Sequence, residues 1–131
     1  MKHLLDTDTC IYVINERPAP AIAQFRKHPV GDIGVSSITA AELAFGVAKS
    51  GSPRNRQALA AFLLPIEVMP FDAQAALIYG EVRAELERRG RPIGPLDLLI
   101  AAHALHLGAV LVTNNLKEFK RVGGLRCVSW A

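Results

Sequence analysis

The sequence has 131 residues, 50% of them hydrophobic, and a formal net charge of +3. This composition excludes a disordered chain and favours one compact domain over residues 1–131. The mildly basic balance permits a nucleic-acid partner without requiring one. No apolar run reaches the length of a membrane span, and only Leu4-Leu5 precede Asp6 as an apolar stretch, so neither a membrane protein nor a signal peptide is expected. Cys10 and Cys127 form no CxxC pair, which predicts reduced thiols and a cytoplasmic location.

Short β-branched runs alternate with helical stretches along the chain. In order, we expect a strand at 2–5, helices at 9–15 and 21–27, a strand at 33–36 and a helix at 39–50 that Gly51 ends. A helix at 57–64, a strand at 66–69 and a long helix between Asp72 and Gly90 follow. An apolar helix at 96–107, closed by Gly108, precedes strands at 110–113 and 125–129. Strands separated by helices require crossovers, so the predicted fold is a three-layer α/β/α protein with a mainly parallel five-stranded sheet.

Acidic and amide side chains stand near the ends of these strands. Asp6 follows the first strand, Glu42 lies early in the helix after the second, and Asp97 begins the apolar helix. Asn115 and Glu118 follow the fourth strand. Ligands of parallel sheets bind beyond the carboxyl ends of the strands, so these groups are expected at one edge. Several carboxylates gathered there are costly without a cation, and oxygen donors favour Mg²⁺ or Mn²⁺, which predicts a metal-dependent phosphodiester hydrolase.

Four of the acids also have structural interpretations. Asp6 could be an ordinary residue that starts a turn at the end of a strand. Glu42 follows Thr39 by three residues, the spacing of a capping box in which Glu42 would bond back to the Thr39 amide. Asp97 follows Gly94-Pro95 and would stabilise a helix N-terminus. Asp8 is interpreted as the N-cap of the first helix.

The spacing of the histidines in the sequence indicates no metal-binding site. His103 and His106 share one side of an apolar helix and are expected to be packing residues. His3 and His28 belong to no recognisable pattern.

Four blocks of the sequence together resemble the PIN-domain ribonuclease toxins of the VapC family. The blocks are "LLDTDTCIYVI", "SSITAAELAFGVAKS", "IYGEVRAELERRGRPIGPLDLLIAAHAL" and "VLVTNNLKEFKRVGGLRCVSW", in order over nearly the whole chain. The resemblance implies a PIN domain and an endoribonuclease that needs Mg²⁺ or Mn²⁺ and cleaves transfer or ribosomal RNA loops. It also implies inhibition by a VapB-type antitoxin, contact with operator DNA only through that antitoxin, and a homodimer.

The resemblance also assigns roles to the acidic residues. Asp6, Glu42 and Asp97 match the three principal acids of the family, with Asp6 and Asp97 as metal ligands and Glu42 binding metal or orienting water. Asn115 stands where many PIN domains have an Asp. Either Asn115 or Glu118 would fill that fourth position.

Two other functions compete with this interpretation. A non-catalytic RNA-binding regulatory module would use the basic loops, while the acids only cap helices; the few aromatic residues disfavour it for single strands. A haloacid-dehalogenase-type phosphatase also places Asp-x-Asp after its first strand. That class usually has Thr or Val where this chain has Cys10, and it needs a later acidic pair where Asp97 is followed by two leucines.

Overall fold

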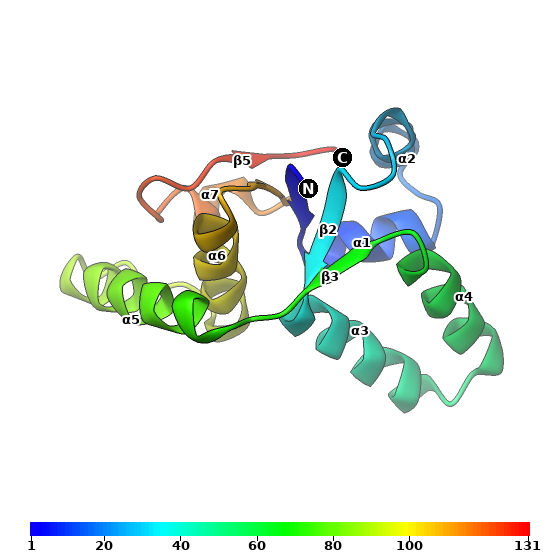
Figure 1. Ribbon diagram of the computed structural model, residues 1–131, viewed down its shortest axis with the longest axis horizontal. Helices are drawn as coiled ribbons and strands as arrows, with labels where there is room; N and C mark the ends of the chain where they lie inside the picture. Colours follow the sequence, from blue (N-terminus) through cyan, green and yellow to red (C-terminus); the bar gives the residue numbers. More distant parts are fainter.

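The computed structural model describes residues 1–131 and contains one parallel sheet (Figure 1). Its strands are β1 (His3–Leu5), β2 (Ile33–Ser36), β3 (Glu67–Met69), β4 (Val110–Val112) and β5 (Cys127–Val128), in the order β3-β2-β1-β4-β5. The helices are α1 (Thr7–Ile14), α2 (Ala19–Lys27), α3 (Ser37–Ser50), α4 (Pro53–Leu63), α5 (Ala73–Arg88), α6 (Pro95–Leu107) and α7 (Leu116–Phe119). Every strand pair is parallel, so the predicted five-stranded α/β sheet is confirmed.

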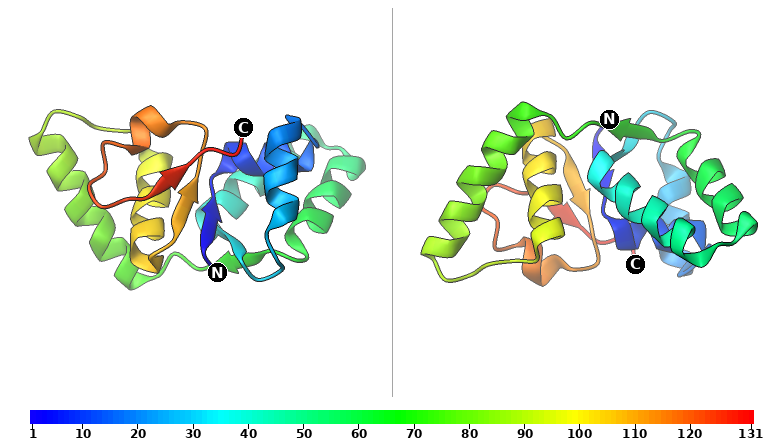
Figure 2. Two further views of the ribbon diagram at one scale, coloured as in Figure 1. Left: turned by 90° about the horizontal axis from the view of Figure 1, so that it is seen from above. Right: turned by 90° about the horizontal axis from the view of Figure 1, so that it is seen from below.

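Alternation along the strands divides the interior into two cores. Leu4 and Leu111 point to one face, where they pack with α5, α6 and α7. Leu5 and Val112 point to the other face, where they pack with residues of α1, α2, α3 and α4. Figures 1 and 2 show these two groups of helices on opposite sides of the strands. The result is the predicted three-layer arrangement.

The ends of several helices differ from the sequence prediction. Helix α3 begins at Ser37 because Ser36 is its N-cap, and α4 begins at Pro53 because Ser52 caps it and proline suits the first helical position. The short helix α7 was not predicted, since four residues give no measurable periodicity. Gly51 and Gly108 do end α3 and α6, with φ of 62° and 65°. No helix has both the length and the apolar character needed to span a membrane.

The strand register determines which side chains meet at each end of the sheet. Leu5 of β1 lies beside Val112 of β4, so the residues that follow both strands emerge at the same edge. His3, at the start of β1, lies beside Ile33 at the start of β2. Asp6 and His3 therefore lie at opposite ends of the parallel strands, with Cα atoms roughly 10 Å apart along an extended strand.

Candidate active site

Asp6 lies at the carboxyl edge of the sheet and is almost fully buried, with 5% of its surface exposed. Its Oδ1 atom accepts a hydrogen bond from the Thr9 amide at 2.9 Å, so Asp6 is the N-cap of α1. The interpretation of Asp8 as this cap is wrong, because α1 begins two residues earlier than predicted. Burial raises the pKa of Asp6, against the lowering effect of hydrogen bonds from Thr113 and Thr9.

Glu42 is held by α1 and not by a capping box. Ser36 caps α3 by accepting a hydrogen bond from the Ile38 amide at 3.0 Å, and Thr39 is fully buried inside the helix. The capping-box interpretation of Glu42 is therefore wrong. The Thr7 hydroxyl instead donates a hydrogen bond of 2.6 Å to Glu42 Oε1, which joins the residue after Asp6 to α3.

Asp97 lies in the first turn of α6, where other carboxylates surround it. Burial raises its pKa to about 7, with further contributions from the charges of Glu118, Asp6 and Glu42. The structure thus brings these four carboxyl groups close enough to interact, although they come from four separate segments of the chain. The amino end of α6 alone would favour an ionised carboxylate, so the repulsion and desolvation outweigh the helix dipole here.

Glu118 is oriented by two hydrogen bonds. Its Oε1 atom accepts from the Gly94 amide at 2.8 Å, and its Oε2 atom accepts from the Asn115 side-chain amide at 2.7 Å. Burial would raise the pKa of Glu118, but these bonds, a bond with Asp97 and the charge of Arg121 bring it below the usual value. Of the two carboxyl groups, Asp97 therefore binds a proton more readily than Glu118 does.

Asn115 and Glu118 have different roles beside Asp97. The Asn115 backbone amide donates to the Thr113 hydroxyl at 3.0 Å, which holds the residue just beyond β4. The Asn115 side chain is exposed and contributes an amide, whereas Glu118 places its carboxylate beside Asp97. Glu118 thus supplies the fourth negative charge, and Asn115 orients it.

The donor set fits a hard divalent cation. Carboxylate oxygens dominate the site, and no histidine or cysteine side chain takes part in its hydrogen bonds. The pKa of Asp97 is raised to about 7 by burial first and then by the negative charges of Glu118, Asp6 and Glu42, which repel its ionised form. A bound Mg²⁺ or Mn²⁺ ion would relieve this repulsion.

The sequence did not identify the residues that orient these acids. Thr7 and Gly94 could not be recognised, because each one orients a carboxylate through a hydrogen bond to a distant segment of the chain. The position of Thr7 directly after the strand-end Asp6 was the available signal.

A hollow adjoins the carboxylates between α1, α3 and α4. Its volume is about 590 Å³, and Thr7 and Glu42 lie on its wall. Arg54 and Asn55 of α4 line the same hollow, so a cation and an amide face the acidic edge. A substrate reaching the carboxylates therefore has room on this side.

Comparison with known proteins identifies the family. A family model described as PIN domain matches residues 3–125. This chain belongs to the PIN domain family. Its PIN-domain relatives include the tRNA(fMet)-specific endonuclease VapC of Shigella flexneri, 45% identical over 100% of this chain and 99% of the relative. The ribonuclease VapC2 of Rickettsia felis is 43% identical, over 99% of this chain and 98% of the relative.

Solved structures agree with this assignment of the PIN domain. The VapBC2 structure from Rickettsia felis, bound to a promoter DNA fragment, matches with a TM-score of 0.91 and 42% identity over 100% of both chains. The DNA-bound VapBC structure from Salmonella typhimurium matches with a TM-score of 0.93 and 43% identity over 100% of this chain and 99% of the other. The resemblance to the VapC-type PIN-domain ribonucleases is confirmed.

Proposed function

We propose that this chain is a metal-dependent endoribonuclease toxin that cleaves structured RNA and is neutralised by a VapB-type antitoxin. The observation that carries the proposal is the convergence of four carboxyl groups in a PIN domain whose full-length relatives are named ribonucleases. A transfer RNA is the first substrate to consider, because the Shigella flexneri relative is named a tRNA(fMet)-specific endonuclease.

Asp6, Asp97 and Glu118 would hold a Mg²⁺ or Mn²⁺ ion, with Glu42 either a further ligand or the group that orients water. The ion, when bound, supplies charge neutralisation at the scissile phosphate and lowers the pKa of an attacking water. The Thr9 amide keeps the Asp6 carboxylate in position.

Other residues of the site would hold the carboxylates in the orientation that metal binding and catalysis need. Thr7 fixes the Glu42 carboxylate, so that its free oxygen accepts a hydrogen bond from a water molecule. Gly94 and Asn115 fix both oxygens of Glu118. Burial and the neighbouring carboxylates favour the protonated form of Asp97, and a bound cation would favour its ionised form.

The partner proposal rests on the assemblies of the relatives. The matching chains of Rickettsia felis and Salmonella typhimurium were solved as VapBC bound to DNA. By this likeness the antitoxin contacts operator DNA and this chain contacts the antitoxin. Phe45 of α3 and Leu64 after α4 are 68% and 87% exposed, the kind of apolar surface that a partner covers. The homodimer stays a prediction, which light scattering of the purified chain tests.

The decisive experiment measures cleavage of end-labelled initiator transfer RNA by the chain freed of antitoxin. Cleavage at a defined position with Mg²⁺ or Mn²⁺, and none with EDTA, supports the proposal. RNA binding without cleavage under all conditions supports the regulatory module instead. Hydrolysis of small phosphomonoesters with intact RNA supports the phosphatase.

Glu42→Gln is expected to lower the cleavage rate by about 100-fold while the chain stays folded. Glutamine can still accept the hydrogen bond from Thr7, but it lacks the negative charge. Single-turnover cleavage and circular dichroism measure the two effects. Glu81→Gln, an exposed change on α5, is the matched control and keeps full activity. Full activity with glutamine at position 42 would remove Glu42 from the mechanism.

A basic pocket lies beside the carboxylates. It is lined only by Arg89, Arg91, Lys117, Lys120 and Arg121, without an apolar side chain. Arg121 donates to the Pro92 carbonyl at 2.9 Å, and its charge reaches Glu118. Lys117 and Lys120 are exposed and take part in no ion pair. These free ammonium groups suit RNA phosphates next to the scissile bond.

Replacing Lys117 and Lys120 together by glutamine is expected to weaken RNA binding about tenfold at low salt. Each lost phosphate contact lowers the slope of log affinity against log salt by about 0.7 to 0.9, so the slope should decrease by roughly 1.5. Filter binding in Ca²⁺ at several salt concentrations measures both. Lys27→Gln with Lys49→Gln removes the same charge from α2 and α3 and serves as the control. An unchanged slope would place the RNA elsewhere.

A further inference from the structure

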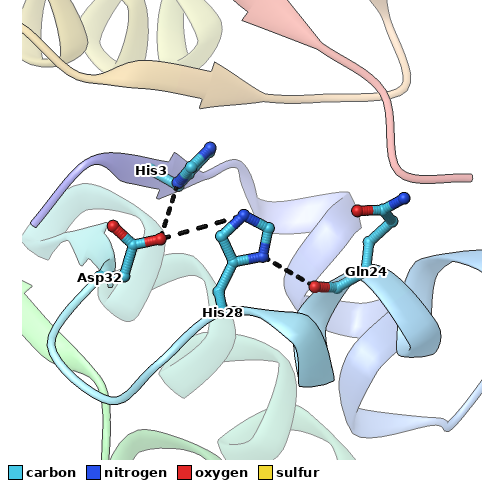
Figure 3. Close-up of polar contacts among 4 residues, drawn as sticks. All are labelled: His3, Gln24, His28 and Asp32. Atoms are coloured by element: carbon cyan, nitrogen blue, oxygen red, sulfur yellow. Dashed lines mark hydrogen bonds and ion pairs between the residues drawn. The ribbon is translucent and has the colours of Figure 1, made fainter.

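Three side chains with metal-binding groups meet at the edge of the sheet opposite the carboxylates. His3 begins β1, His28 follows the last residue of α2, and Asp32 precedes β2. Figure 3 shows both imidazoles directed toward the Asp32 carboxylate. One ligand atom from each residue lies within 4.8 Å of the other two. We propose that His3, His28 and Asp32 form a binding site for a divalent transition-metal ion such as Zn²⁺, separate from the carboxylate site.

The spacing of the ligand atoms suits such an ion. His3 Nδ1 lies 3.1 Å from Asp32 Oδ2, and His28 Nε2 lies 3.9 Å from the same oxygen. Ligands of tetrahedral zinc, with bonds of 2.0–2.1 Å, lie about 3.3 Å apart. Both distances to Asp32 Oδ2 lie within about 0.6 Å of this spacing, so small side-chain rotations would bring the three ligand atoms toward three positions of a tetrahedron.

The hydrogen bonding of His28 leaves the metal-binding nitrogen free. His28 Nδ1 lies 2.8 Å from the Gln24 carbonyl oxygen, which can only accept, so Nδ1 carries the hydrogen (Figure 3). In the neutral ring the lone pair is then on Nε2, facing the carboxylate of Asp32. Two acceptors face each other across this gap, and a cation between them would satisfy both. An imidazole held through its other nitrogen by a carbonyl is also the usual arrangement around protein-bound zinc.

Trp130 covers the same cluster. Its ring stacks on His28 with centroids 4.9 Å apart and an interplanar angle of 24°, and it lies 5.7 Å from the His3 ring. Trp130 is 7% exposed, so it excludes water from one side of the imidazoles. The chain contains one tryptophan, so its tryptophan fluorescence reports on the surroundings of Trp130, which include this cluster.

The ligand set selects a different ion from that of the carboxylate site. Two imidazoles and one carboxylate suit Zn²⁺, Co²⁺ or Ni²⁺, whereas Mg²⁺ prefers oxygen ligands. An ion here would join the start of β1 to the segment between α2 and β2. Its role is structural, since the carboxylates lie at the other edge of the sheet.

The test titrates the EDTA-treated full chain with ZnCl₂ and, separately, with CoCl₂. Zinc is expected to change the Trp130 fluorescence at one equivalent and to raise the melting temperature by roughly 10 °C at 100 times the dissociation constant. Cobalt is expected to show the visible absorption of a tetrahedral complex. His28→Gln and Asp32→Asn should each weaken zinc binding by at least about 100-fold.

Two control variants test where the zinc ion binds. His106→Gln makes the same chemical change outside the cluster and should bind zinc like the parent. The double change Asp6→Asn with Asp97→Asn removes charge from the carboxylate site and should leave the zinc-induced fluorescence change intact. Zinc binding that survives both His28→Gln and Asp32→Asn, or that is lost with the carboxylates, would overturn the proposal. So would the absence of any zinc effect on Trp130.

Discussion

Asp6→Asn is expected to lower the rate of RNA cleavage by about 1,000-fold or more and to leave the fold intact. The Asp6 carboxylate is close enough for its charge to act on Asp97, and its loss is expected to remove several kcal/mol of stabilisation from the reaction. Asparagine caps helices as well as aspartate does, so the hydrogen bond from the Thr9 amide to the side-chain oxygen persists. Single-turnover cleavage at saturating Mg²⁺ or Mn²⁺ measures the rate, and thermal melting measures the fold.

A matched control separates catalysis from helix capping. Asp72 caps α5 by accepting from the Ala75 amide at 3.0 Å, in the same way that Asp6 caps α1. Asp72→Asn should therefore cleave RNA at the parental rate. If Asp6→Asn also cleaves normally, Asp6 is a capping residue and not part of the catalytic site.

Asp97→Asn is expected to abolish cleavage and, at the same time, to stabilise the metal-free protein at pH 8. The pKa of Asp97 is raised from 3.8 to about 7, so the folded state disfavours the ionised carboxyl group. Asparagine carries no charge at any pH. The full shift corresponds to about 4 kcal/mol, but partial exposure of Asp97 to water reduces the expected gain to about 1 to 2 kcal/mol.

The sign of the pH dependence follows from the raised pKa. Below pH 3.8 the Asp97 carboxyl is protonated in both the folded and the unfolded state, so it does not lower the free energy of unfolding of the wild type. Between pH 3.8 and about 7 the folded state binds more protons than the unfolded state, so wild-type stability falls as pH rises. The advantage of Asp97→Asn should grow over this interval and stay constant above it.

Urea unfolding in EDTA at several pH values measures this advantage. Asp72→Asn is again the comparison, because the backbone hydrogen bond from Ala75 lowers the pKa of Asp72 and asparagine there brings no gain at pH 8. Addition of Mg²⁺ or Mn²⁺ should stabilise the parent more than Asp97→Asn. A variant that is less stable than the parent at pH 8 would show that the carboxylates do not repel one another.

The existence of the strands and their parallel pairing could be predicted from sequence because both depend on local signals. Each strand was a short apolar run, and the helices between them forced parallel pairing. The position of Asp6 followed from the rule that ligands of parallel sheets bind beyond the carboxyl ends of the strands. The order β3-β2-β1-β4-β5 was not predicted, because pairing between distant strands leaves no local pattern.

The connections within the site were less accessible to sequence reasoning. "TAAE" has the spacing of a capping box, yet Ser36 begins α3 earlier and leaves Glu42 to bond with Thr7. The short helix α7, which carries Glu118, has too few residues for a periodic pattern. His3, His28 and Asp32 are separated along the chain and meet only because β1 and β2 pair in register. The bond between Thr7 and Glu42 and the meeting of His3 with Asp32 both depend on contacts between segments far apart in sequence.

The central position of β1 has a consequence for synthesis on the ribosome. β1 is made first, yet one of its neighbours, β4, ends at Val112, and Glu118 comes later still. The acidic site around Asp6 can therefore form only after most of the chain has left the ribosome. A partly made chain cannot assemble the acidic site. The proposed nuclease activity therefore arises only after translation has passed residue 118.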